Sequence, residues 1–293
     1  MNPEFIDRIK RIAIISLVSD DILLNKLVLK GGSAINVIHK ISSRSSIDID
    51  YSIAGDFEVD EMKTIEERIS KVLHENFKEN GFRIFDFKFY EQPEKIDARV
   101  KHFWGGYVVE FKIIESEKFE KLKDIDSIRR NALQVGKKNS TKFTIDISKY
   151  EYVDKKADYD FNGYTLYAYT PAMIICEKLR AICQQIPEYK TIVKTITSKP
   201  RARDFYDIYE LFNKFKIDLS EKENIILLKD IFESKHTPIE FLLKIDESKD
   251  LHSDGFNAVI DTVENSKDLK DFDFYFAFVK KVIEEVYPKI ASL

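Results

Sequence analysis

The chain has 293 residues, of which 44% are hydrophobic, so it is long enough for one large domain or two modest domains with packed cores. Its 9 glycines and 7 prolines are too few for long disordered linkers, and its net charge of −4 argues against a generally basic surface while leaving a local basic patch open. No apolar run approaches the roughly 20 residues that span a bilayer, so we predict a soluble, cytoplasmic protein with no membrane partner.

The first half of the chain is predicted to mix strands and helices, because its apolar residues recur with both periods. Ser33 is predicted to cap a helix that follows a tight turn at Gly31 and Gly32. Residues 117–135 are typical of a helix or an irregular insertion. In chain order the other predicted elements are a helix at 3–23, a strand at 26–30, a strand at 46–53, a helix at 58–80 that ends at Gly81, and strands at 82–90, 107–114 and 142–148.

The second half is predicted to be helical. Helical periodicity begins at Pro171, resumes at Pro200 and continues over residues 220–290, which contain no recognisable motif. Cys176 and Cys183 would lie about 10 Å apart along the first of these helices, too far for a disulfide. The predicted fold class is α+β, with a mixed sheet and flanking helices in a domain at 1–165, followed by a helical domain at 166–293.

A pair of carboxylates in the strand at 46–53 is the first sign of chemistry. Asp48 and Asp50 would share one face of the strand, where like charges repel and each carboxylate loses solvation if the face is covered. A divalent cation such as Mg²⁺ removes both penalties, whereas a solvated face needs no metal. Upstream, Gly31, Gly32 and Ser33 would let backbone amides approach a phosphate, although a strand–helix turn can also use glycine for packing alone.

A third acid would complete a two-metal site and accept a proton from an attacking hydroxyl. Glu110 and Asp146 both lie in apolar strands, and their spacing does not choose between them.

Positive charge is concentrated in one segment of the otherwise acidic chain. Between residues 178 and 203 the only acid is Glu188, and such a basic patch suits a polyphosphate or an RNA backbone, although an ordinary basic loop is the alternative. Asp204 and Asp207 follow three residues apart on one helical turn, where they can be helix-terminal charge or a polar pair. The basic residues are Lys178, Arg180, Lys190, Lys194, Lys199, Arg201 and Arg203.

Four segments together resemble a known family. The patterns are "LKGGSAIN…SRSSIDIDYSI", "TIDIS", "YTPAMIICEKLRAI" and "PRARDFYDIYEL", and they span residues 27–211. In this order they resemble the AbiEii/AbiGii toxin family of the nucleotidyltransferase superfamily, which has the DNA polymerase beta-like catalytic fold. Each segment is weak by itself, and their joint occurrence makes the resemblance specific.

The resemblance implies roles for individual residues. It favours Asp146 over Glu110 as the third acid, so that Asp48, Asp50 and Asp146 would bind Mg²⁺ or Mn²⁺. It also implies that the helical domain contributes Lys178 and Asp204 to the active-site cleft, while Asp207 holds its helix in place. The implied catalytic residues are Asp48, Asp50, Asp146, Lys178 and Asp204. The implied nucleotide-binding residues are Gly31, Gly32, Ser33, Arg44, Ser46, Lys178 and Arg203.

The function that the resemblance implies is metal-dependent transfer of a nucleoside monophosphate from an NTP to an acceptor hydroxyl. The acceptor would be RNA, at the 3′ end of tRNA, and the protein would be the toxin of a toxin–antitoxin or abortive-infection system. A cognate antitoxin is implied without a stable complex. The alternatives are a small-molecule nucleotidyltransferase of the aminoglycoside type, a non-catalytic nucleotide-binding protein, and a kinase-like enzyme, which α- against γ-labelled NTP would distinguish.

Overall fold

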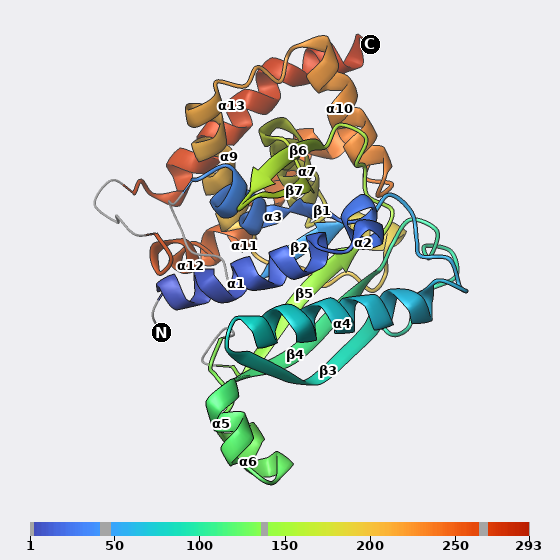
Figure 1. Cartoon of the computed structure of the whole chain (residues 1–293). Coiled ribbons are helices and arrows are strands. Elements are labelled where there is room, and N and C mark those ends of the chain that lie inside the picture. Colours follow the sequence, from blue (N-terminus) through green and yellow to red (C-terminus); the bar gives the residue numbers. More distant parts are fainter. Residues whose placement is uncertain (1–2, 42–47, 136–139, 264–268, 293) are drawn as a thin grey trace.

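The strands of the computed structural model form one mixed sheet. The model describes residues 3–41, 48–135, 140–263 and 269–292. Within them, seven strands pair in the order β3-β4-β5-β2-β1-β7-β6 (Figure 1). The pairs β2–β5 and β1–β7 are parallel, and the others are antiparallel. The strands are β1 (Val28–Lys30), β2 (Ile49–Ser52), β3 (Phe82–Gln92), β4 (Gly106–Glu115), β5 (Lys142–Ser148), β6 (Ala157–Phe161) and β7 (Tyr164–Ala168).

Helices cover the sheet and form the rest of the molecule. In the first half they are α1 (Pro3–Val18), α2 (Asp21–Lys26), α3 (Gly31–Ser33), a π-helical turn (Ala34–Ile38), α4 (Met62–Glu79), α5 (Ser116–Lys121) and α6 (Ile125–Arg130). In the second half they are α7 (Pro171–Cys183), α8 (Tyr189–Ile192), α9 (Ala202–Phe215), α10 (Lys222–Glu233), a 3₁₀ segment (Ile239–Ser248), α11 (Lys249–Asp254), α12 (Asn257–Ile260) and α13 (Phe272–Ala291). Figure 1 shows α1 and α4 lying across the sheet, α5 and α6 projecting from one end, and α9, α10 and α13 gathered at the other.

The strands at the centre of the sheet alternate as the sequence predicts. In β5, Ile145 and Ile147 are buried, and Asp146 between them is partly exposed on the opposite face. β2 alternates in the same way around Asp50. The apolar face therefore supplies the core, and the other face is left for polar chemistry.

Most of the predicted elements are confirmed. The strand at 142–148 is observed with the same bounds, and the helix at 58–80 is observed as α4, followed by Gly81 with a φ of 86°. The first helix is divided, because the side chain of Asp20 accepts hydrogen bonds from the amides of Ile22 and Leu23 and begins α2 there. Cys176 and Cys183 are free and buried, as expected.

Two details differ from the sequence-based expectation. Ser33 does not cap a helix: the helix begins at Gly31, and the Ser33 hydroxyl donates to the backbone oxygen of Asp48 at 2.7 Å. The hairpin of β6 and β7 extends the sheet, so the boundary expected at residue 165 falls inside β7. The division into two domains stays a prediction. Within the described ranges, no helix combines the length and apolar character needed to cross a bilayer.

Candidate active site

A cavity of about 920 Å³ lies between the sheet and the helical half. Strands β1, β2, β4 and β5 line one side, and α7, α9 and α12 line the other. The sheet wall carries Asp48, Asp50 and Asp146, and the helical half contributes most of the basic side chains. Negative and positive groups thus face a common space, an arrangement that suits a metal and a polyphosphate together.

The three acids come together through strand pairing. Asp50 in β2 is in parallel register with Asp146 in β5, so the two carboxylates stand side by side on neighbouring strands. Asp48 directly precedes β2, which begins at Ile49, and it lines the same cavity. The three acids that the family resemblance implies therefore line one cavity.

The glycine turn lies directly against Asp50. Gly31 has a φ of 61°, and a Cβ placed on it would be 2.7 Å from Oδ2 of Asp50. A side chain here would therefore be strained and would collide with the carboxylate. Gly31 and Gly32 line the cavity, as predicted, whereas Ser33 is fully buried beneath the turn and holds the backbone of Asp48. Ser33 thus helps to hold Asp48 in place through its backbone rather than by contacting a ligand.

Burial and like charge act together on Asp50. Burial, with the added effect of Asp146 and Asp48, raises the pKa of Asp50 to about 6, and Lys30 opposes the rise. A bound cation would relieve this repulsion. Among the described residues, no three His, Cys, Asp or Glu side chains already form a metal-holding group. Mg²⁺ needs only one or two protein carboxylates, because waters and substrate phosphates complete its shell, so an all-carboxylate donor set fits it.

Glu110, the alternative third acid, lies apart from this site. It forms an ion pair with Lys142 at 3.0 Å and lies within 4.0 Å of Lys88. Its neighbours form a separate surface depression that includes Glu66 and Tyr90. The geometry therefore agrees with Asp146 as the third acid.

Lys178 and Asp204 meet in the cavity wall as an ion pair. The Nζ atom of Lys178 lies 2.6 Å from Oδ1 of Asp204 and 2.8 Å from Oδ2 of Asp207, and all three residues are buried. The two aspartates come from one turn of α9, and the lysine comes from α7, which opens with Pro171 after the N-cap Thr170. Asp207 is 1% exposed, which agrees with a supporting role.

The basic segment predicted from the sequence divides into three parts. Lys178 and Arg180 are buried in ion pairs at the cavity wall, so they add nothing to an exposed basic surface. Lys190 and Lys194 are exposed outside the cavity lining. The last three residues, Lys199, Arg201 and Arg203, line the cavity. Arg44 and Ser46, which were predicted to bind nucleotide, lie outside the described residues.

Comparison with known proteins identifies the family. The model of the family described as "Nucleotidyl transferase AbiEii toxin, Type IV TA system" matches residues 15–278, which is most of the chain. The chain belongs to the AbiEii nucleotidyltransferase toxin family. This confirms the resemblance to AbiEii toxins and the nucleotidyltransferase class of enzyme.

Solved structures similar to this AbiEii family member were also found. A putative nucleotidyltransferase from H. pylori shares 14% identity, with a TM-score of 0.49 and coverage of 98% of this chain and 95% of that chain. JHP933 from Helicobacter pylori shares 14% identity, with a TM-score of 0.48 and coverage of 99% and 94%. An antigenic nucleotidyltransferase-like protein from Paracoccidioides brasiliensis shares 14% identity, with a TM-score of 0.36 and coverage of 78% and 88%. No curated protein matches the chain.

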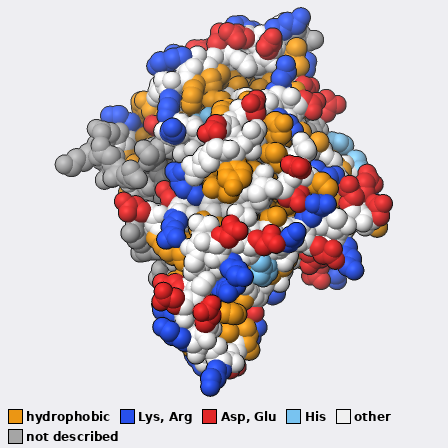
Figure 2. Space-filling view, viewed as in Figure 1, with side chains coloured by type: hydrophobic (Ala, Val, Ile, Leu, Met, Phe, Trp, Pro, Cys, Tyr) orange, Lys and Arg blue, Asp and Glu red, His pale blue; other side chains and the backbone are white. Residues whose placement is uncertain are grey.

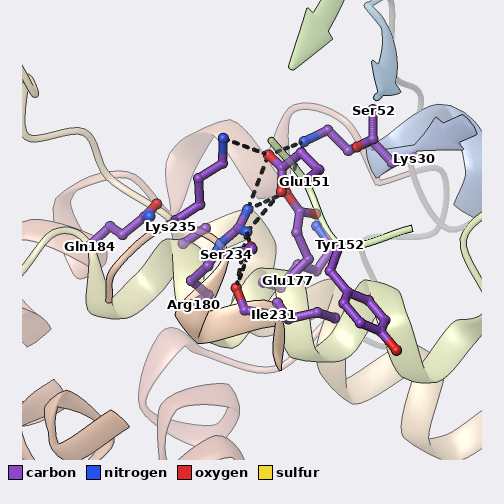
Figure 3. A network of polar contacts seen from close by, with 12 residues as sticks. Lys30, Ser52, Glu151, Tyr152, Glu177, Arg180, Gln184, Ile231, Ser234 and Lys235 are labelled. Atoms are coloured by element: carbon purple, nitrogen blue, oxygen red, sulfur yellow. Dashed lines mark hydrogen bonds and ion pairs between the residues drawn. The ribbon is translucent and has the colours of Figure 1, made fainter. Parts of the chain in front are cut away.

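A buried charge network at the cavity wall joins the sheet to the helical half of this AbiEii protein (Figure 3). Glu151, which follows β5, lies 2.8 Å from Arg180 of α7, 3.1 Å from Lys30 of β1 and 3.7 Å from Lys235. Glu177 of α7 lies 3.4 Å from Lys30 and 3.7 Å from Arg180. Burial lowers the pKa of Lys235 to about 8, with Glu151 opposing this effect and Arg180 adding to it. Three cations therefore share two carboxylates at the cavity wall.

Sequence reasoning missed several of these residues. Lys30 directly precedes the glycine turn and could have been found from that position. Glu151 and Lys235 stand in no local pattern, and they meet only because the chain folds back between residues 151 and 235. Gln184 and Trp104 also line the cavity without a sequence signal.

Asp50→Asn should stabilise this protein in the absence of metal. Because the folded-state pKa of Asp50 is raised to about 6 from 3.8, the ionised carboxylate costs stability near neutral pH, about 3 kcal/mol. The cost diminishes as pH falls from about 6 toward 3.8, where the carboxyl is protonated in both states. Thermal unfolding in EDTA at neutral and acidic pH should show a higher Tm for Asp50→Asn only at neutral pH.

The same unfolding experiment in Mg²⁺ should change the Tm of the wild type and not that of Asp50→Asn. Mg²⁺ held by Asp50 would bind only the folded wild type, so it should raise the wild-type Tm and leave that of Asp50→Asn nearly unchanged. Asp160→Asn, in an exposed position on β6, is the matched control and should respond to Mg²⁺ as the wild type does. An equal Mg²⁺ response in wild type and Asp50→Asn would contradict a role for Asp50 in metal binding.

Proposed function

We propose that this protein transfers a nucleoside monophosphate from an NTP to an acceptor hydroxyl, using Mg²⁺ or Mn²⁺ held by Asp48, Asp50 and Asp146. The observation that carries the proposal is the side-by-side placement of Asp50 and Asp146 in a cavity that also receives basic side chains. When bound, the metal would neutralise the triphosphate and polarise the reacting phosphorus.

The residues of the chain would provide placement and charge. Gly31 and Gly32 would offer backbone amides to the phosphates, since no side chain blocks their approach. Lys178 and Arg203 would face the triphosphate, with Asp204 fixing the position of the Lys178 ammonium group. Asp146 would accept the proton of the acceptor hydroxyl. The acceptor oxygen forms a bond to the α-phosphorus, the bond to the β-phosphate oxygen breaks, and pyrophosphate leaves.

The acceptor that we propose is RNA, at the 3′ end of a tRNA, and the protein would then act as a toxin in the cytoplasm, with a cognate antitoxin as its genetic partner. The family description supports the toxin–antitoxin role. Figure 2 shows Lys and Arg side chains interspersed with Asp and Glu over one face of the molecule, so the described part of that face offers no extended basic surface. The exposed Lys199 beside the cavity instead favours recognition of an RNA end.

Label transfer tests the proposal. Incubation with each α-labelled NTP, Mg²⁺ and total RNA should give label in an RNA of tRNA size, and γ-labelled NTP should give none. Label from the γ position would indicate a kinase-like reaction instead. Label in a small molecule, with none in RNA, would overturn the RNA acceptor and keep nucleotidyl transfer.

A further inference from the structure

Three basic residues of the cavity lie in the irregular turn before α9 and at the start of that helix. We call residues 199–203 the basic turn; it includes Lys199, Arg201 and, at the start of α9, Arg203. Two buried side chains hold its backbone. Oε1 of Gln185 accepts from the amide of Lys199 at 2.8 Å, and Nδ1 of His252 accepts from the amide of Arg201 at 3.0 Å. The turn is thus fixed by side chains from two separate segments of the helical half, one after α7 and one in α11.

The contact with residues 252–258 is close and involves three positions. Beyond His252, a Cβ placed on Gly255 would lie 2.2 Å from Cβ of Pro200, so the proline ring approaches the Gly255 backbone to a distance that only glycine allows. The guanidinium of Arg203 donates through Nε and Nη2 to the backbone oxygen of Ala258, at 3.3 and 3.1 Å. Gly255 and Ala258 also line the cavity, so this segment meets the basic turn at the cavity itself.

The state of His252 fits a role as hydrogen-bond acceptor. The residue is 0% exposed, and burial lowers its pKa to about 4, with Asp204 opposing this effect. The ring is therefore neutral near neutral pH, with Nδ1 as acceptor and the proton on Nε2, which has no hydrogen-bond partner among the described residues. A phenylalanine could pack against Phe205 and would remove the unpaired Nε2, but it would leave the amide of Arg201 without its acceptor. The acceptor at Nδ1 is the feature that distinguishes histidine at this position.

We propose that residues 252–258 clamp the basic turn against the cavity and that His252 is a positioning residue for polyphosphate binding there. The inference deepens the proposed function, on which it rests for the identity of the polyphosphate as the NTP. It gives a role to a part of the chain that carries no motif. The clamp acts through the backbone of the turn, so its loss should weaken anion binding without removing any charge.

The test measures the turn and its ligand separately. His252→Phe should speed amide exchange in a peptide covering residues 197–203 and weaken binding of inorganic tripolyphosphate with Mg²⁺ about tenfold by calorimetry. His252→Asn should restore binding to within about twofold of the wild type, because its Oδ1 can take the acceptor position of Nδ1. Gly255→Ala should act like His252→Phe by pushing Pro200 away, and it carries the test if His252→Phe does not fold.

Two controls and the opposing results complete the design. Gly55→Ala, where a Cβ would meet nothing within 4 Å, should match the wild type. So should His74→Asn, at an exposed position on α4. Unchanged exchange, or unchanged tripolyphosphate affinity, in both His252→Phe and Gly255→Ala would overturn the clamp. A wild type that binds tripolyphosphate through the clamp but transfers no nucleotide would overturn the proposed function alone.

Discussion

Asp48→Ala combined with Asp50→Ala should reduce nucleotidyl transfer by at least about 10³-fold, because the variant loses two of the three carboxylates proposed to hold the metal. Asp50 stands beside Asp146, and one remaining carboxylate cannot place both the metal and the attacking oxygen. Transfer of α-labelled NMP under single-turnover conditions measures the effect. The fold should survive, since both side chains line the cavity and neither belongs to the apolar core.

The chain contains its own control for this variant. Asp158 and Asp160 form a second D-x-D pair on β6, in exposed positions outside the cavity lining. Asp158→Ala with Asp160→Ala removes the same charge and should retain full transfer activity. Undiminished transfer by the Asp48/Asp50 variant would show that the chemistry occurs elsewhere.

Glu151→Gln should destabilise the protein by about 3–5 kcal/mol, because it removes the main counter-charge of three buried cations. Although burial alone would raise it, Arg180, Lys235 and Lys30 hold the pKa of Glu151 well below its usual range. Glutamine keeps the shape and removes the charge, which leaves Glu177 as the remaining carboxylate of the network (Figure 3). Urea unfolding at neutral pH, fitted with a common slope, measures the loss.

An exposed ion pair of equal length is the matched control. Glu188 lies 2.8 Å from Lys244, the same distance as Glu151 from Arg180, but both partners are exposed. Glu188→Gln should cost much less stability than Glu151→Gln, because water screens an exposed pair. A similarly small cost for Glu151→Gln would mean that the network does not join the two halves energetically.

The elements that the sequence predicts well are those with one strong period. Strict alternation gave β5 its observed bounds, because burial of one face leaves no other register for its isoleucines. The β6 strand was missed because it has only five residues, two of them aspartates, which are rare in strands. The Asn162–Gly163 turn that follows it, with both φ values positive, is a typical hairpin signal. Ser33 was misassigned since its hydroxyl bonds to a backbone oxygen that is distant in sequence.

The candidate site was predictable only where neighbouring residues carry the pattern. Asp48 and Asp50 lie two positions apart, so their common face follows from strand geometry. Asp146 could be assigned only through the family resemblance, because the pairing of β2 with β5 cannot be predicted from local sequence. Glu151, Lys235 and His252 have no local signal, and each gains its role from a partner at least 29 residues away in the chain.

Binding of Mn²⁺, followed by its EPR signal, tests the central claim most directly. The claim is that Asp48, Asp50 and Asp146 form one metal-binding face of the cavity. With a non-hydrolysable NTP present, the wild type and the Asp158/Asp160 control should take up Mn²⁺, and the Asp48→Ala, Asp50→Ala variant should lose that uptake. Equal uptake by all three proteins would contradict the claim.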